Sequence, residues 1–369
     1  MKLLNFTLSA ILLFLIFTIL VGGKDILMPF VIAIIIWYFV ISLVHVFQKL
    51  KFPGIKKRKM KYWQALTLSV LTCLAVLFCV SWIVNNSINQ VIAQAPKYEE
   101  KLKEVVVRVE NFMDFEFLQG ESEDEIAVDE TVIITGQQVS SIDKSPSLIE
   151  RIDFVEFFTK FAQALGNIAR NMGVILIYVL FLLIESRTFG KKLKNMVPDQ
   201  GKYDATQGVL SRIVEDVNEY LKIKSLVSLA TAILSYIALK IIGVDFAEFW
   251  AFLIFLLNFI PIIGSFIAVL FPVLLSLIQF PTIYPFVAVV IILFTIQIIM
   301  SQIIEPRLTG DSLNLSPLVI LLSLAFWGSV WGVVGAILCV PIMVIINIVL
   351  AKFEKTRWLA VLMSAKGNV

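Results

Sequence analysis

The chain has 369 residues, of which 59% are hydrophobic and 16% are charged, and its formal net charge at pH 7 is +3. Soluble domains carry about 25% charged residues, so this composition excludes an ordinary soluble protein and favours one embedded in lipid. The single histidine, His45, excludes most zinc-dependent and histidine-dependent enzyme chemistry.

Apolar segments predict membrane helices along the chain. They lie at about 3–21, 26–47, 63–84, 168–185, 223–243, 249–278, 284–304 and 317–350. The run Phe249–Ile304 is the clearest, because its 56 residues include no charged side chain. As one helix it would be roughly 84 Å long, against about 30 Å of hydrocarbon, so it must fold back. We therefore predict an all-α polytopic membrane protein with about eight transmembrane helices.

Lysine and arginine residues in the loops predict the orientation of the chain. They crowd the segments 48–62 and 186–224 and recur in the tail. All of these segments face the cytoplasm if there are eight spans and both termini lie inside. This scheme divides the chain into helices 1–3 in 1–84, an extracytoplasmic region 85–165, helices 4–8 in 166–351 and a cytoplasmic tail 352–369.

The region 85–165 is acidic, with 16 acidic and 7 basic residues and a net charge of about −9. Apolar residues recur at spacings of three and four from Tyr98 to Phe112, which predicts that the third helix continues beyond the membrane. A matching stripe leads into the fourth helix, so we expect an extended helical hairpin. The intervening residues 120–146 read as an acidic loop.

Residues 201–221 form the second amphipathic element. Val209, Ile213 and Val217 lie on one helical face, opposite acidic residues. This pattern predicts a cytoplasmic helix that lies on the membrane surface or on the helix bundle, where it either packs or gates.

Helix breakers interrupt the long uncharged run. Pro261 removes a backbone hydrogen bond, Gly264 adds flexibility, and the polar Asn258 comes just before them. Irregular backbone at this depth is tolerated where protein buries it or water reaches it, and it forms the binding site in secondary transporters. The alternative is a proline kink that only helps helices to pack. Further prolines make 258–285 a candidate re-entrant hairpin.

Polar residues farther along the chain extend this candidate pathway. Gln297, Gln302 and Glu305 project from the end of one predicted helix. Glu305 either serves transport, as ionisable groups in spans often do, or pairs at the interface with Arg307. The predicted substrate or ion pathway consists of Asn258, Pro261, Gly264, Gln297, Gln302, Glu305, Ser316 and Pro317.

Several chemistries have no signature in the sequence. The three cysteines, Cys73, Cys79 and Cys339, fall inside apolar segments and read as small core residues. Motifs for metalloproteases, serine hydrolases and phosphate-binding loops are missing. We predict no enzyme activity, no metal, no cofactor and no nucleic-acid partner.

A series of C-terminal motifs resembles the autoinducer-2 exporter family, also called the PerM-like permeases. These motifs are Asn258–Gly264 (NFIPIIG), Glu305–Gly310 (EPRLTG), Ser312–Leu318 (SLNLSPL), Phe326–Gly328 (FWG) and Trp331–Gly335 (WGVVG). The resemblance implies a multi-pass permease of the bacterial inner membrane that forms homo-oligomers. It carries Pro306 and Gly310 over as further motif residues. It leaves the substrate open, since members are associated with autoinducer-2 export or with sodium/proton antiport.

Three functions are therefore in competition. The first is export of a small neutral polar molecule such as autoinducer-2, bound by amides and hydroxyls including Asn258 and Ser265. The second is monovalent cation/proton antiport with Glu305 as the titrating group. The third is a membrane scaffold whose acidic outer region recruits partners.

Overall fold

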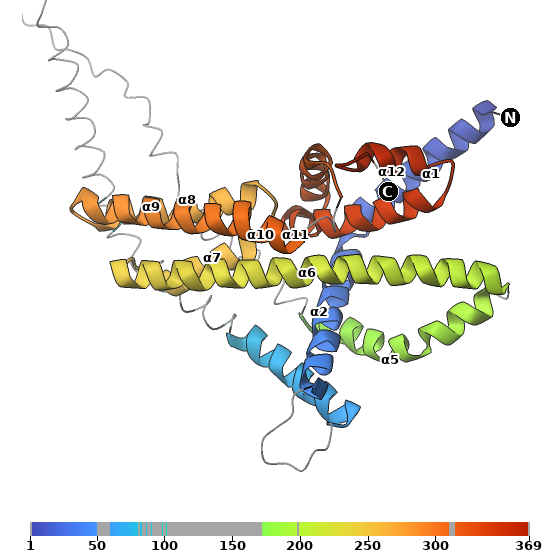
Figure 1. The fold of residues 1–369 in the computed structure, drawn as a ribbon, viewed down its shortest axis with the longest axis horizontal. Helices are drawn as coiled ribbons and strands as arrows, with labels where there is room; N and C mark the ends of the chain where they lie inside the picture. Colours follow the sequence, from blue (N-terminus) through green and yellow to red (C-terminus); the bar gives the residue numbers. More distant parts are fainter. Residues whose placement is uncertain are drawn as a thin grey trace, which may run out of the picture.

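The computed structural model describes residues 2–49, 60–79, 172–197, 199–309 and 314–367, together with positions 82, 86, 90, 98 and 101. The described residues form helices and no strand, only an isolated bridge between Leu315 and Ser364 (Figure 1). The N-terminal helices are α1 (Lys2–Gly22), α2 (Lys24–Lys49), the helix Tyr62–Cys79 and α5 (Met172–Met196). The remaining ones are α6 (Gln200–Ile242), α7 (Ala247–Leu257), α8 (Ile263–Gln279), α9 (Ile283–Ile298), the π-helix η1 (Ile299–Ile304), α10 (Glu305–Thr309), α11 (Pro317–Lys352) and α12 (Arg357–Met363).

The all-α polytopic architecture is confirmed. Five helices in the described part are long and apolar enough to cross a membrane, or six if the two halves of α5, bent by 64°, count as one span. The sequence predicted about eight. Helices α7 and α8 are shorter apolar helices of 11 and 17 residues, so each is too short to be a full span by itself. Most of the predicted acidic region 85–165, including the loop 120–146, lies outside the described residues.

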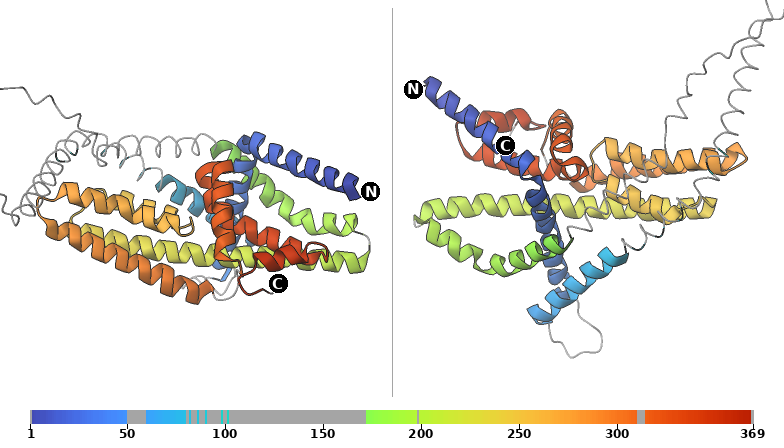
Figure 2. Two further views of the ribbon diagram at one scale, coloured as in Figure 1. Left: turned by 90° about the horizontal axis from the view of Figure 1, so that it is seen from above. Right: turned by 180° about the vertical axis from the view of Figure 1, so that it is seen from behind.

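Helix α6 is the longest helix in the described part of the chain. Its 43 residues run unbroken from an Asp199 N-cap, whose carboxylate accepts from Lys202 N, to a Gly243 C-cap at φ 85°. The sequence predicted a separate amphipathic helix over 201–221 followed by a span over 223–243. The structure joins them, because no proline or glycine separates these two segments. Figures 1 and 2 show α7, α8 and α9 alongside the C-terminal half of α6.

Helices α7 and α8 form a helical hairpin, with the predicted break at its tip, Asn258–Ile262. The two ends of the hairpin meet at Gln279, the last residue of α8. Its side chain accepts a hydrogen bond from Asp245 N at 2.9 Å and donates one to Gly243 O at 2.8 Å. The hairpin therefore enters and leaves at one end of α6, while its tip reaches Thr231 in the apolar part of that helix.

Helix α11 also folds back on itself. Gly332 has φ 61° and ψ −140°, which is not helical, and the Ser323 hydroxyl donates to Cys339 O at 3.1 Å across the bend. The sequence predicted one helix over 317–350. Glycine permits the fold because it adopts positive φ at no steric cost. Indole Nε1 of Trp331, beside the bend, donates to Leu20 O at 3.0 Å and so holds the end of α1.

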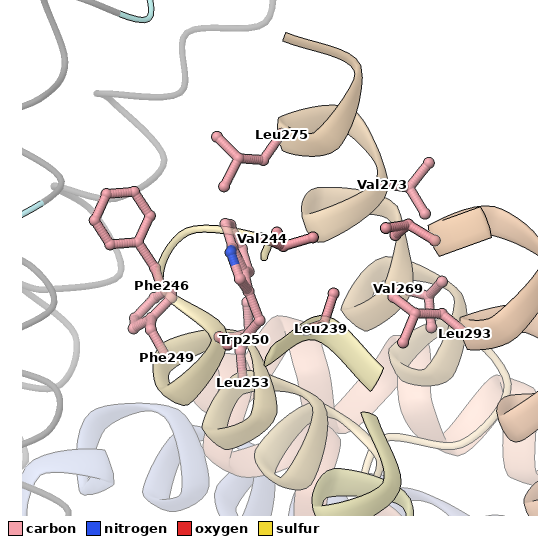
Figure 3. Close-up of a cluster of buried hydrophobic side chains, with 12 residues drawn as sticks. Leu239, Val244, Phe246, Phe249, Trp250, Leu253, Val269, Val273, Leu275 and Leu293 are labelled. Atoms are coloured by element: carbon pink, nitrogen blue, oxygen red, sulfur yellow. The ribbon is translucent and has the colours of Figure 1, made fainter. Parts of the chain in front are cut away.

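A buried apolar cluster fixes the α7–α8 hairpin against α6 and α9 (Figure 3). At its centre Trp250 is 1% exposed, stacks on Phe271 with ring centroids 6.4 Å apart, and donates its indole N–H to Asp245 O. Leu239 of α6 and Leu293 of α9 are likewise almost fully buried. This packing sets the position of the hairpin tip relative to α6.

Candidate functional site

Five polar residues form a buried stripe along α6, which we call the polar stripe. They are Tyr220, Lys224, Ser228, Thr231 and Ser235, all at most 6% exposed. Their spacings of three and four residues place them on one helical face. Sequence reasoning missed the stripe, although this periodicity within an apolar segment was a usable signal.

The hairpin tip presents Asn258 to this stripe. Asn258 is 1% exposed, and its amide nitrogen lies 3.5 Å from the Thr231 hydroxyl. Its carbonyl oxygen accepts from Gln297 Nε2 at 3.0 Å and from the Ser265 hydroxyl at 3.3 Å. Four elements, α6, the tip, α8 and α9, thus contribute one side chain each to a neutral cluster, which we call the amide cluster.

Not every buried polar atom near the amide cluster is paired. Gln297 Oε1 and the Ser228 hydroxyl have no hydrogen-bond partner among the described residues, and farther along the polar stripe neither does the Tyr220 hydroxyl. Burying such groups unpaired costs about 1–3 kcal/mol each, so native structures keep few of them. These atoms are therefore ready to bind a ligand or water.

The turn at the tip is strained. Ile262 has φ 61° and ψ −65°, and Ile263 N donates to Pro261 O at 2.6 Å, which makes a γ-turn with positive φ at its centre. Gly264 is required here, because a Cβ at this position would lie 2.0 Å from Leu257 O. Strained backbone of this kind concentrates at ligand sites and switch regions.

Glu305 lies beyond the amide cluster and forms a salt bridge with Lys224 of the polar stripe. The distance between Lys224 Nζ and Glu305 Oε1 is 2.5 Å, and the two side chains are 7% and 23% exposed. The alternative partner, Arg307, is exposed. The sequence did not indicate Lys224, because pairing between residues so far apart in the chain depends on how the helices pack.

The π-helix η1 sets the phase between Gln297 and Glu305. A π-helix hydrogen-bonds from i to i+5, so it takes up one more residue per turn than an α-helix. This extra residue brings Glu305 to the face that Gln297 occupies two turns earlier, toward α6. Gln302, inside η1, is exposed and takes no part in the amide cluster.

Ser316 and Pro317 lie at the start of α11, as its N-cap and first residue. Their neighbour is the C-terminal tail, since Ser316 N donates to Met363 O at 2.9 Å. The structure thus brings Asn258, Pro261, Gly264 and Gln297 together, links Glu305 to them through the polar stripe, and leaves Ser316 and Pro317 at a separate junction. Within the described ranges, His, Cys, Asp and Glu form no group of three or more that could hold a metal.

Comparison with known proteins identifies the family. The sequence profile of the AI-2E family transporters matches residues 8–355. The chain belongs to this family. The resemblance inferred from the C-terminal motifs is thereby confirmed, and the protein is a member of a transporter family with several membrane-spanning helices.

Individual relatives agree with this assignment. A Borreliella burgdorferi protein is 37% identical over 209 residues, which are 55% of each chain, so the match spans about half of that relative. "Putative transport protein YhhT" of Escherichia coli is 27% identical over 282 residues, 75% of this chain and 73% of its own. AI-2 transport protein TqsA of Escherichia coli is 32% identical over 226 residues, 61% of this chain and 64% of its own.

Proposed function

We propose that this AI-2E family transporter exports a small, neutral, polar molecule such as autoinducer-2, and that the amide cluster binds it. The observation that carries the proposal is the composition of this cluster. Asn258, Gln297, Ser265 and Thr231 offer donors and acceptors without net charge, and Asn258, Gln297 and Thr231 are buried.

The unpaired atoms give the cluster its capacity for a ligand. Gln297 Oε1 accepts hydrogen bonds, and the Ser228 hydroxyl both donates and accepts. A hydroxyl-rich molecule satisfies both, while an ion would meet no opposite charge at Asn258. The AI-2 transport protein TqsA, similar over 61% of this chain, supports the same substrate class.

The proposal includes a location and an orientation. The protein resides in the bacterial cytoplasmic membrane as a multi-pass homo-oligomer with both termini in the cytoplasm. Both chain ends and the start of α6 lie toward the same end of the molecule in Figures 1 and 2, which agrees with termini on one side. Residues 85–165 are then extracytoplasmic, and the charged start of α6 is cytoplasmic.

Flux into proteoliposomes tests the proposal. Purified protein is reconstituted, labelled autoinducer-2 is added, and uptake is compared for the wild type, Asn258→Ala and the control Gln207→Ala. Gln207 is an exposed residue near the start of α6. We expect transport by the wild type and the control and at least a tenfold loss with Asn258→Ala. Equal transport by all three would remove the amide cluster from the pathway.

Monovalent cation/proton antiport is the second candidate, favoured by the largely buried carboxylate of Glu305 at the end of the polar stripe. A pH-sensitive dye inside the same proteoliposomes reports proton movement after sodium or potassium is added. If sodium or potassium drives proton movement that Glu305→Gln abolishes, and autoinducer-2 is not transported, antiport replaces the first proposal.

The scaffold hypothesis has its own test, the deletion of residues 120–146. Loss of function in cells while flux in proteoliposomes persists would favour a scaffold.

A further inference from the structure

The Lys224–Glu305 salt bridge lies at the boundary between the charged and the apolar part of α6. On one side of it, Glu215, Asp216 and Glu219 make the helix strongly polar. On the other side, no charged residue follows until Lys240. The ion pair is thus the last pair of charges before the apolar interior, about 10 Å along the helix from Thr231 and the amide cluster.

We propose that Lys224 and Glu305 form the gate that closes the amide cluster off from the side of the membrane on which the charged start of α6 lies. The gate rests on the proposed function in one respect, because it assumes that substrate reaches the amide cluster from this side. When the ion pair separates, α10 moves away from α6 and the polar stripe becomes continuous from Tyr220 to Thr231.

Unpaired polar atoms lie on both sides of the ion pair along the stripe. The Tyr220 hydroxyl is one turn before Lys224, and the Ser228 hydroxyl is one turn after it. Both residues are at most 5% exposed. Buried polar side chains thus recur at successive turns on both sides of the ion pair, so the stripe resembles a lined path that the ion pair interrupts.

The ion pair is suited to opening and closing. A buried salt bridge gains little net stability, because the cost of removing two charges from water offsets most of their attraction. Lys224 has a long flexible side chain. Glu305 follows the π-helix η1 and starts the five-residue helix α10, so its position depends on a short irregular segment.

Accessibility of Ser228 tests the gate without any need to know the substrate. Ser228→Cys is placed in the full chain after Cys73, Cys79 and Cys339 are replaced by alanine, and a charged, membrane-impermeant thiol reagent is applied to membrane vesicles of either orientation. We expect slow modification while the ion pair is intact. Lys224→Gln or Glu305→Gln should accelerate it at least tenfold, from the side that bears the start of α6.

Two further variants separate gating from misfolding. Lys224→Met combined with Glu305→Gln leaves no unpaired buried charge, so it should fold and still react fast. The exchange of Lys224→Glu with Glu305→Lys restores the ion pair and should restore protection. Lys240→Gln, which breaks the exposed pair with Glu248, is the matched control and should leave the rate unchanged.

The outcome is decisive in either direction. Fast modification in the neutral double variant together with protection in the exchanged variant supports the gate. The same slow rate in the wild type and the neutral double variant overturns it, as does fast modification when the ion pair is intact. Autoinducer-2 flux that depends on Asn258 would survive that result, so the gate and the proposed function fail independently.

Discussion

Gln297 donates a hydrogen bond from its side-chain amide to the side-chain oxygen of Asn258 at 3.0 Å. The bond joins α9 to the strained tip of the α7–α8 hairpin, inside a region without charged side chains. Both residues are at most 7% exposed, so the bond is shielded from water. The position of the tip therefore depends on a neutral contact that a polar ligand is able to rearrange.

Replacement of Gln297 by alanine should impair transport and stability together. The change removes one of the two hydrogen bonds that Asn258 Oδ1 accepts, which costs about 0.5–1.5 kcal/mol. Gln302→Ala is the matched comparison, because Gln302 is exposed and lies only one turn of η1 farther on. We expect about tenfold or greater loss of flux for Gln297→Ala and little change for Gln302→Ala, measured in proteoliposomes beside thermal unfolding in detergent. The reverse order would place the pathway on the other face of η1.

The close approach at Gly264 leads to a second prediction. Gly264→Ala places a Cβ 2.0 Å from Leu257 O, so the turn must open. Overpacking usually costs about 1–3 kcal/mol, and backbone contact puts this case at the upper end. Gly328→Ala is the control, because nothing lies within 4 Å of a Cβ there. Thermal unfolding in detergent should separate the two variants clearly, and equal melting temperatures would contradict the close approach.

Much of the membrane architecture was predictable from the sequence, for physical reasons. Charge-free runs must lie in lipid, and their length against the bilayer thickness required the chain to fold back. Pro261 and Gly264 marked the break, because proline breaks helical hydrogen bonds and glycine permits close approach. The re-entrant hairpin was predicted over 258–285, whereas the structure has it over 247–279 with the break at its tip. Asn258 was therefore identified correctly as a residue at the break.

Other features depended on packing and phase, which local patterns do not determine. Lys224 was counted among the basic residues that predict orientation, and its partner Glu305 follows far along the chain. Gln297 and Gln302 were treated alike, because the sequence does not show which face of this segment packs against α6 and which is exposed. The bend in α11 was missed, because the segment around Gly332 is compatible with a continuous helix. Only the backbone angle of Gly332, φ 61°, reveals the bend.

The C-terminal tail offers a third prediction. Helix α12 and the residues that follow it hold the residues before α11, through the bond from Ser316 N to Met363 O and another from Ala365 N to Asn314 O at 3.2 Å. Ala360 of α12 is fully buried, so Ala360→Glu would force a charge into the packing and release the tail. We expect a loss of about 2–4 kcal/mol.

The same substitution at an exposed position controls for the added charge. Ala365→Glu keeps the main-chain bond of that residue and should be nearly neutral. Limited proteolysis is the measurement, with cleavage between residues 314 and 367 expected only for Ala360→Glu. If both variants resist proteolysis equally, the packing of α12 does not hold the C-terminal tail in place.

The contact between Tyr98 and Asp245 gives a prediction for alkaline pH. The Tyr98 hydroxyl donates to Asp245 Oδ2 at 2.6 Å, next to the base of the α7–α8 hairpin. Burial, followed by the hydrogen bond to the Asp245 carboxylate and its negative charge, raises the pKa of Tyr98 above its usual 10.0. The folded protein therefore keeps this proton at a pH where the unfolded chain has lost it. The resulting stability is complete below pH 10 and declines as the pH rises above that value.

Tyr98→Phe should remove this decline along with the hydrogen bond. At pH 8 the variant is expected to be less stable than the wild type by about 1 kcal/mol, and the difference should shrink between pH 10 and pH 11. Because Tyr98 is only partly buried, the change should stay below about 1 kcal/mol per pH unit. Tyr284→Phe, at a side chain that is 81% exposed, is the control. Chemical unfolding in detergent across this pH range measures all three proteins, and parallel curves for the wild type and Tyr98→Phe would show that the Asp245 contact does not hold the proton.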